Sequence, residues 1–512
     1  MTWPRRRRWI GVLAVVVLAA VWPRTSIAAT AGLKAIDRQV PVGGPPVTGV
    51  VSDVPTDSST TVPATTAVLA TTIPPIQAGN GPQETTTTAL PIIVAPGGTS
   101  PGGTSPGATQ APGPTTVSAT TVKPGAATTA TTVVAGAATV PDLRSRIDRA
   151  LANARAGSAG VLVTIDGIGS VYERDPDAAR VPASTQKLYV AGTVLLMMGG
   201  DYRYTTEIRA STLVGADGVL NGDLVVKASG DPSFGVAQLR SLADAVLKSG
   251  VRSVQGGLVV DDSHFDDQTV VLGWKPSFTP GEVGVLGAFA VDGNHRNEKD
   301  PGMANLERFR AALTAKGIAV IGVSRRGTLP AGGPVLASIN SGPLRDLVRQ
   351  TLKKSDNTYA ELLAKELGAV NGSGTTANGV AVIAREFAHL GIVAPVQVDG
   401  SGLSSANRST ARGQVQWLQR LAGSSAAADL RNALPISCVD GTLRSRMCKT
   451  SAAAKVQAKT GALDNVVGIS GYTITASGRA VTFSILLNAV PSATRARAAA
   501  DQALEAISAA RL

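Results

Sequence analysis

The sequence predicts a layered α/β domain of the α+β kind, an antiparallel sheet flanked by helices and split by an inserted β-rich subdomain. A hairpin pattern near residue 160 and a meander after residue 456 supply strands at both ends of the folded part. Helical apolar spacing follows the hairpin and precedes the meander. Between about 201 and 342, short strands alternate with turns, which indicates a subdomain inserted into the chain.

Residues 1–28 have the pattern of an export signal. Arg5 to Arg8 form its positive segment, 9–22 its apolar stretch, and Ser26-Ile27-Ala28 a small-x-small cleavage site. The apolar stretch is shorter than the roughly 20 residues that cross a bilayer. We therefore expect an exported, extracytoplasmic protein of the cell wall or periplasmic space with a cleaved signal. Membrane association through an uncleaved N-terminal anchor is the alternative.

Residues 29–140 are rich in Pro, Thr, Gly and Ala and carry few charges. The run Pro96-Gly97-Gly98-Thr99-Ser100 is repeated at once over 101–105. Such a composition offers little apolar surface to offset the entropy of ordering, which predicts a disordered tether. Two interpretations stay open: a spacer that reaches through a cell wall, or a solvated tail with no specific partner.

The split domain is expected over 141–210 and 343–512. Its first part opens with Leu143, Ile147 and Leu151 at helical spacing, and Asp166-Gly167 marks a hairpin turn. The expected helices are 141–154, 184–198, 344–353, 358–368, 377–390, 414–422 and 495–512, and the expected strands are 160–166, 169–173, 456–460, 466–474 and 480–487. In the inserted subdomain, 211–342, we expect strands at 224–227, 253–261 and 318–322 and helices at 236–248 and 303–316.

The composition argues against a nucleic-acid partner. The net charge of +12 comes from 48 Lys and Arg against 36 Asp and Glu, and four of the positive charges belong to the signal. Charged residues make up 16% of the chain and aromatic residues 4%, and no long basic run lies outside the signal. The remaining positive charge favours an anionic wall or membrane surface as the surroundings.

Cys438 and Cys448, the two cysteines of the chain, lie ten residues apart. In an exported protein this pair predicts a disulfide across a small loop, with two free buried thiols as the alternative. The spacing excludes a Cys-x-x-Cys redox or metal site. Closing so short a loop stabilises the fold by roughly 2–3 kcal/mol, because it lowers the entropy of the unfolded chain.

Ser184-Thr185-Gln186-Lys187 places a serine and a lysine three residues apart at the start of an apolar helix, so that both lie on one face. The helix N-terminus supplies free N–H groups and partial positive charge at the serine. The apolar residues after Lys187 predict a partly buried amine with a lowered pKa, which makes it a usable base. Ser184 is therefore a candidate nucleophile. An N-cap serine beside a surface lysine is the alternative.

Ser355-Asp356-Asn357 precedes another expected helix. Ser355 is a candidate to relay a proton to a leaving amine, and Asn357 is a candidate to bind a substrate backbone. The alternative is plain helix capping. Ser, Asp and Asn are frequent at helix entrances, and Thr358 with Glu361 matches a capping box.

Lys459-Thr460-Gly461 lies in an expected strand. Gly461 would let a peptide run close along the strand edge as an added strand, and Lys459 and Thr460 would meet its carboxylate. The backbone N–H of Ala462, with that of Ser184, is a candidate oxyanion hole. A surface Lys-Thr turn is the alternative for this string alone.

The three strings together predict one serine acyl-transfer site with lysines in place of a histidine base. They follow one another at intervals of 171 and 104 residues, each in a suitable secondary-structure context. None of the three histidines lies near them in the sequence, so a Ser-His-Asp triad has no local support. The chain has histidine at His264, His295 and His389.

From about residue 140 to its end, the chain resembles the penicillin-binding proteins of the D-alanyl-D-alanine carboxypeptidase/D-alanyl-D-alanine endopeptidase family, the low-molecular-mass class C type. The resemblance goes beyond the three strings. Further similar segments are 226–232, with Gly-Asp-Pro, 259–263, Gly273-Trp274, 399–404 (Asp-Gly-Ser-Gly-Leu-Ser) and 440–443 (Asp-Gly-Thr-Leu).

The resemblance implies a penicillin-binding, transpeptidase-like catalytic domain. It implies that Ser184 is acylated by the penultimate D-Ala of a peptidoglycan stem peptide, that D-Ala is expelled, and that water then releases the acyl-enzyme. β-Lactam antibiotics would acylate the same serine and leave slowly, which makes them inhibitors. Members also cut D-Ala to diaminopimelate cross-links. No cofactor is expected.

Two departures from the family bear on the substrate side-chain preference: Ser405 stands where some relatives carry an arginine, and the insertion is shorter than in the largest members. Glu282 would either meet the free amine of a diaminopimelate side chain or be a solvated loop acid. The acidic run from Asp261 to Asp267, with His264, is expected to be a polar turn rather than a metal site, because a serine mechanism needs no metal.

Two rival functions stay open. A β-lactamase would need a well-placed base that activates water for fast deacylation, and the sequence assigns none. A catalytically quiet penicillin-binding or wall-binding protein would be expected to lack one catalytic string, whereas all three are complete.

Overall fold

The computed structural model describes residues 139–328 and 333–512. The predicted signal, 1–28, and nearly all of the predicted tether, 29–140, lie outside these residues. Among the described helices, none has the length and apolar character needed to cross a membrane.

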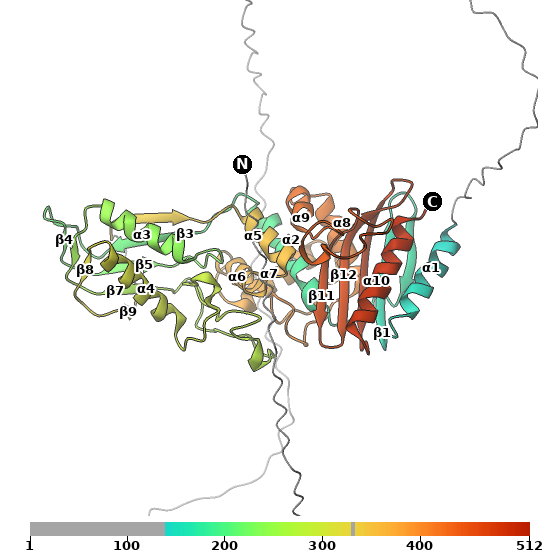
Figure 1. Cartoon of the computed structure of the whole chain (residues 1–512), viewed down its shortest axis with the longest axis horizontal. Coiled ribbons are helices and arrows are strands. Elements are labelled where there is room, and N and C mark those ends of the chain that lie inside the picture. The colour runs from blue at the N-terminus through green and yellow to red at the C-terminus, as the bar shows by residue number, and fades with distance from the viewer. Residues whose placement is uncertain (1–138, 329–332) are drawn as a thin grey trace, which may run out of the picture. The chain divides into compact units, whose positions relative to one another are not determined.

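The first sheet joins the two ends of the folded part (Figure 1). It is antiparallel, with strand order β11-β12-β13-β1-β2, and β1 pairs with β13 so that Val161 faces Ile485. Because the N-terminal hairpin pairs with the C-terminal meander, the split domain closes through its sheet, and the predicted fold class is confirmed. The strands are β1 Ser158–Ile165, β2 Gly169–Arg174, β11 Gln457–Leu463, β12 Val466–Ile474 and β13 Ala480–Asn488.

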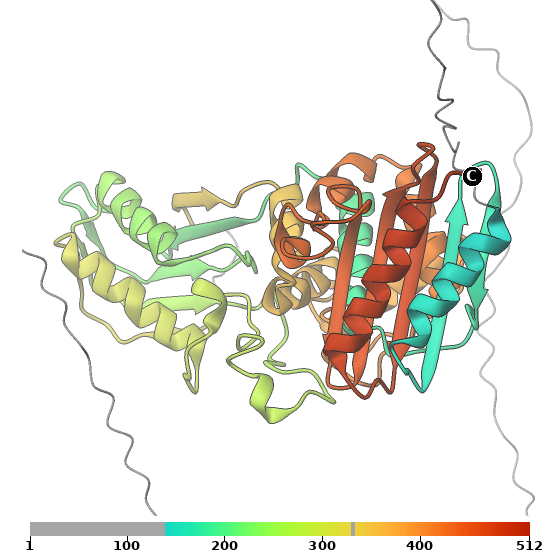
Figure 2. The same cartoon turned by 45° about the vertical axis from the view of Figure 1, so that its right-hand side comes forward.

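Helices cover both faces of this sheet. Val161 and Val163 pack under α1 (Val140–Ala152) and α10 (Ala493–Ser508), which lie side by side over one face (Figure 2). Leu162 points to the other face and packs under α8 (Ala411–Ala422), because side chains alternate along a strand. Further helices complete the domain: α2 Lys187–Met198, α5 Leu344–Lys354, α6 Asn357–Ala369, α7 Thr376–His389 and α9 Ala427–Ala433.

The inserted region has a sheet of its own, with strand order β10-β3-β5-β7-β9, and a small three-stranded sheet, β4-β6-β8. Its main sheet begins with β3, which pairs with β10 and β5. The expected boundary after Ala210 therefore falls one strand too late. The elements are β3 Thr205–Ala210, β4 Val219–Leu220, β5 Leu224–Lys227, α3 Val236–Lys248, β6 Ser253–Val254, β7 Leu258–Asp261, α4 Pro301–Ala315, β8 Ala319–Val320, β9 Arg325–Arg326 and β10 Val335–Asn340.

The single strand expected at 253–261 is two strands in different sheets. Gly256 and Gly257 separate β6 from β7, and a Cβ on Gly257 would lie 2.0 Å from the carbonyl oxygen of Val323. Backbones approach so closely there that only glycine fits, and the chain crosses from one sheet to the other at this point.

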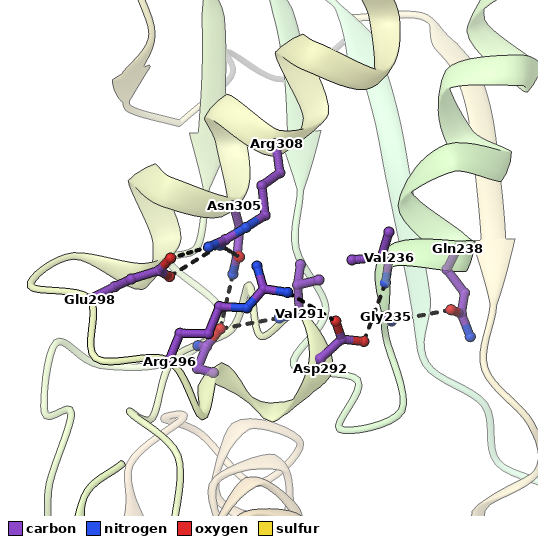
Figure 3. Close-up of polar contacts among 10 residues, drawn as sticks. Gly235, Val236, Gln238, Val291, Asp292, Arg296, Glu298, Asn305 and Arg308 are labelled. Atoms are coloured by element: carbon purple, nitrogen blue, oxygen red, sulfur yellow. Dashed lines mark hydrogen bonds and ion pairs between the residues drawn. The ribbon is translucent and has the colours of Figure 1, made fainter. Parts of the chain in front are cut away.

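A polar cluster fixes the loop that leads into α4 (Figure 3). Asn305 donates from Nδ2 to Asn294 Oδ1 over 2.9 Å, and Arg308 pairs with Glu298. The turn before it is left-handed at three consecutive residues, with φ of 51° at Asp292, 69° at Gly293 and 52° at Asn294. The cluster stabilises this backbone, which turns the chain back toward the first turn of α6.

Candidate active site

The nucleophile candidate lies on a tight turn. Residues Ala183–Gln186 form a single 3₁₀ turn (η1), and α2 continues from Lys187. Ala183 has a φ of 47°, a left-handed conformation that a residue other than glycine adopts only under constraint. Ser184 is partly exposed while the residues on both sides of it are buried. The turn therefore presents the hydroxyl of Ser184 to a cavity of about 780 Å³.

Lys187 is fully buried and makes three hydrogen bonds, one for each N–H of its ammonium. Its Nζ donates to Ser184 Oγ over 3.0 Å, to Asn357 Oδ1 over 2.7 Å and to the carbonyl oxygen of Ser401 over 2.6 Å. Burial lowers the pKa of Lys187 to about 8, although nearby carboxyl groups partly oppose this. A surface lysine beside an N-cap serine does not describe this position.

Ser355 and Asn357 sit where α5 meets α6. Ser355 ends α5 in a left-handed conformation, with a φ of 59°, and Asp356 caps α6 by accepting from the N–H of Tyr359 over 3.1 Å. Asn357 bridges two partners: Oδ1 accepts from Lys187, and Nδ2 donates to the carbonyl oxygen of Glu282 over 2.8 Å. The second string therefore reaches both Lys187 and the inserted region.

The alternative of a capping box formed by Thr358 and Glu361 is wrong. Asp356 is the N-cap, Thr358 accepts from the N–H of Gly284 over 2.8 Å, and Glu361 is buried. Glu361 Oε1 instead accepts from the N–H of Ser401 over 2.6 Å. The carboxyl group of Glu361 therefore lies against the loop whose Ser401 carbonyl oxygen binds Lys187.

Lys459 is the other buried lysine of this site. Its Nζ donates to Ser355 Oγ over 2.9 Å and to the carbonyl oxygen of Thr460 over 2.7 Å. Burial, and then the charge of Lys187, hold the pKa of Lys459 well below its usual range. A lysine that gives up its proton this readily, hydrogen-bonded to a hydroxyl, is suited to proton exchange with Ser355.

Gly461 brings strand β11 against the turn of the nucleophile. A Cβ on Gly461 would lie 2.8 Å from the carbonyl oxygen of Pro182 and 3.3 Å from the backbone nitrogen of Ser184. The glycine is therefore required for the approach of β11 to η1, in addition to the predicted approach of a peptide along the strand edge. Thr460 Oγ1 donates to Thr442 Oγ1 over 2.8 Å. Ala462 follows along the same edge.

The three strings border one cavity of about 780 Å³. Its volume is within the range of ligand-binding pockets, and one wall of it, with Phe278 and Glu282, comes from the inserted region. Its lining includes Ser184, Ser355, Asn357, Thr460, Gly461, Ala462, Lys354, Leu403, Thr442 and Arg497.

A buried loop that carries Asp399 supports Lys187 from behind. Asp399 accepts from the N–H groups of Gly402 and Ser404 over 2.8 and 2.7 Å, and from Trp274 Nε1 over 2.9 Å. Burial, with the negative charge of Asp399 beside it, raises the pKa of Glu361 to about 8. The pocket at neutral pH therefore favours a protonated Glu361, which leaves Asp399 as the counter-charge to Lys187.

The disulfide between Cys438 and Cys448 is confirmed, with their Cα atoms 4.7 Å apart. It closes the loop that carries Thr442, the hydroxyl that contacts Thr460. Two free thiols are excluded.

The acidic run of the inserted region is engaged with basic or polar partners. Asp262 pairs with Arg326 over 2.6 Å, and Asp266 pairs with Lys365. His264 Nε2 lies 2.6 Å from Glu366 Oε2. Within 139–328 and 333–512, no group of three His, Cys, Asp or Glu is arranged to hold a metal ion. The run joins the inserted region to α6.

Comparison with known proteins identifies the family. The model of the D-Ala-D-Ala carboxypeptidase 3 (S13) family matches residues 143–280 and 284–510. The chain belongs to this family. The S13 chain is thus a serine-type D-Ala-D-Ala carboxypeptidase.

The names of similar proteins are consistent with this family. A D-alanyl-D-alanine carboxypeptidase of Actinomadura sp. (strain R39) is 29% identical over 437 residues, which cover 68% of the chain and 81% of the relative. Carboxypeptidase DacB of Mycolicibacterium smegmatis is 29% identical over 371 residues, or 68% of the chain and 80% of the relative. The crystal structure of penicillin-binding protein 4 from Haemophilus influenzae superposes with a TM-score of 0.64, at 22% identity, over 72% of the chain and 98% of that structure. This last likeness establishes the shared fold.

Proposed function

We propose that this S13 enzyme cleaves D-Ala-D-Ala and related D-Ala cross-links in peptidoglycan stem peptides through an acyl-enzyme on Ser184. The observation that carries the proposal is the position of Lys187 Nζ, which is within 3.0 Å of Ser184 Oγ and also bonded to Asn357. A buried amine with a pKa of about 8 beside a partly exposed hydroxyl is the arrangement that activates a serine without histidine.

The first half-reaction would use each string in turn. Ser184 Oγ attacks the carbonyl carbon of the penultimate D-Ala, and its proton passes to Lys187 Nζ. The N–H groups of Ser184 and Ala462 would stabilise the oxyanion, while Thr460 and Lys459 lie toward the terminal carboxylate. When the C–N bond breaks, Ser355 Oγ donates a proton to the leaving nitrogen and recovers one from Lys459 Nζ, to which it is bonded.

The second half-reaction would return the enzyme to its resting state. Once the amine has left, the proton that Lys187 took from Ser184 would pass through water in the emptied site to Lys459, which gave one up, so that Lys187 is again neutral. Water would then attack the ester carbonyl carbon and lose a proton to Lys187. Lys187 would return this proton to Ser184 Oγ, to which it is bonded, as the ester C–O bond breaks. A β-lactam would acylate Ser184 in the same way, but its leaving nitrogen stays tethered to the acyl group and obstructs water. This accounts for inhibition. We further propose that the protein acts outside the cytoplasm, at the cell wall, after export by the N-terminal segment, with a membrane anchor as the alternative to cleavage.

The test is the intact mass of the full chain after brief exposure to penicillin. We expect a stable adduct on the wild type and on Ser338→Ala, which removes an exposed serine of β10, and none on Ser184→Ala. Intact drug with no adduct on any variant would favour a catalytically quiet wall-binding protein. Rapid loss of drug without an adduct would favour a β-lactamase.

A further inference from the structure

A second groove opens beside the active-site cavity. It has a volume of about 850 Å³ and lies between the last turns of α5 and the loop closed by the Cys438–Cys448 disulfide. Lys354 and Thr442 line both the groove and the active-site cavity, so the two are continuous. The groove is lined by Asp346, Arg349, Gln350, Lys353, Lys354, Asp440, Gly441, Thr442 and Arg444.

The two walls of the groove are held together by buried and half-buried contacts. Lys353 Nζ donates to the carbonyl oxygen of Leu434 and to Asp440 Oδ2, both over 2.6 Å. A Cβ on Gly441 would lie 2.8 Å from the carbonyl oxygen of Lys353, so the loop packs directly on the end of α5. The disulfide restrains the same loop from its other side. These contacts join the two walls of the groove.

The lining of the groove is positively charged. The ion pair of Lys353 with Asp440 cancels one charge of each sign. Arg349, Lys354 and Arg444 remain, all exposed, and none of the three forms an ion pair within the described part of the chain. Asp346 is the one other acidic side chain of the lining. Three cations against one anion favour a ligand that carries carboxylates.

The groove begins on the side of the leaving group. Lys354 directly precedes Ser355, which would protonate the leaving nitrogen, and Thr442 is hydrogen-bonded to Thr460, which would face the carboxylate. A single D-Ala leaving group would lie beside these residues. A leaving group that continues as a peptide would find the groove open to it past Lys354 and Thr442, which line both hollows.

We propose that this groove is a subsite for the acidic peptide on the leaving-group side of a cross-linked stem peptide. The inference rests on the proposed function and deepens it, because it assigns cleavage of cross-links to particular residues. Arg349, Lys354 and Arg444 bind carboxylates of the second stem, while the disulfide loop and α5 hold them in place.

The test compares two substrates that share one acyl part. One releases D-Ala, and the other, a cross-linked stem dimer, releases a carboxylate-bearing peptide. We measure kcat/KM for both with the full chain, with Arg349→Ala/Arg444→Ala, and with a matched control, Arg240→Ala/Arg385→Ala. The control removes two exposed arginines outside both cavities.

The ratio of kcat/KM for the dimer to that for the D-Ala-releasing peptide should fall about tenfold in the groove variant and stay unchanged in the control. Added salt should lower this ratio in the wild type and have little effect on it in the groove variant. If the groove variant is not acylated by penicillin, Arg349→Gln and Arg444→Gln singly carry the test with the same expected direction.

An unchanged ratio, or an equal loss with both substrates, would overturn the groove as a subsite. If the wild type releases D-Ala but the ratio of the two kcat/KM values is the same in the groove variant, only the groove as a subsite is overturned. Release of neither product by the wild type overturns the proposed function as well.

Discussion

At the scale of single residues, the site depends on the protonation state of Lys187, on which two effects oppose each other. Three hydrogen-bond acceptors and the nearby carboxyl group of Asp399 favour the ammonium form of Lys187, and complete burial favours the neutral amine. Burial is the larger effect. The resulting pKa of about 8 lies near physiological pH, where a general base is most effective.

This predicts the pH dependence of acylation. Lys187 accepts the proton of Ser184 only as the neutral amine, and the neutral fraction grows as pH rises toward the pKa of about 8. The second-order rate constant for acylation by penicillin should therefore rise about tenfold per pH unit below 8 and level off above it. Stopped-flow or quenched mass measurements across this range would check it.

Lys187→Arg is the informative variant for this prediction. A guanidinium cannot be deprotonated in this range, so acylation should fall by at least about a hundredfold at every pH. A rate constant for the wild type that does not change between about pH 6 and 9 would contradict the role of Lys187 as the base.

At the scale of elements, the active site is a junction between strand β11 and turn η1, and Gly461 makes it possible. Gly461→Val should force β11 away from Pro182 and Ser184, because its Cβ would lie within 2.8 Å of backbone. We expect a loss of about 1–3 kcal/mol in the free energy of unfolding and a loss of acylation of about a hundredfold or more. Chemical unfolding and the rate of adduct formation measure the two effects.

Gly342→Ala is the matched control for that prediction, since a Cβ there would meet nothing within 4 Å and its φ is not left-handed. It should leave both quantities unchanged. Normal acylation in Gly461→Val would mean that β11 does not set the position of the nucleophile.

The elements that the sequence predicts best are those with one dominant pattern. The expected bounds of β5, α3 and β12 agree with the structure. Helix α3 has its apolar residues at helical spacing, and β5 and β12 are short buried runs between turn residues. Strand β3 was missed although Thr206, Ile208 and Ala210 alternate inward, and its charged residues between them obscured the pattern. Helix α9 was missed because a run of seven residues is too short for periodicity to show.

The candidate site likewise has residues that the sequence predicts and residues that it does not. Ser184, Lys187, Ser355, Asn357 and Lys459 were predictable, because their side-chain types carry chemistry in a recognisable order. The carbonyl oxygen of Ser401 was not, since a backbone acceptor has no sequence signature. The buried role of Glu361 was not predictable either, because its spacing from Thr358 also matches a capping box, the alternative for this string.

At the scale of the whole molecule, the inserted region is tied to the catalytic domain through the active site itself. Asn357 bonds to the backbone of Glu282, and Thr358 contacts both Gly284 and His295. Farther along α6, Glu366 and Lys365 pair with His264 and Asp266. An insertion held at so many points along one helix supplies a wall of the cavity and also constrains α6.

Trp274 offers a test of this coupling. Its indole donates to the buried carboxylate of Asp399, which belongs to the loop that presents the carbonyl oxygen of Ser401 to Lys187. Trp274→Phe keeps an aromatic ring but removes one donor from a buried charge. The free energy of unfolding should fall by about 1–3 kcal/mol, and acylation should slow several-fold as the 399–404 loop loosens. Chemical unfolding and penicillin acylation would measure these effects.

Leu272→Ala, in the same loop and 89% exposed, should change neither quantity. If Trp274→Phe matched the wild type in both, the inserted region would be a passive neighbour of the catalytic domain. A fall in stability with normal acylation would mean that the contact holds the two regions together without ordering the lysine. Slower acylation in step with lower stability is the result expected if the insertion helps to hold Lys187 against Ser184.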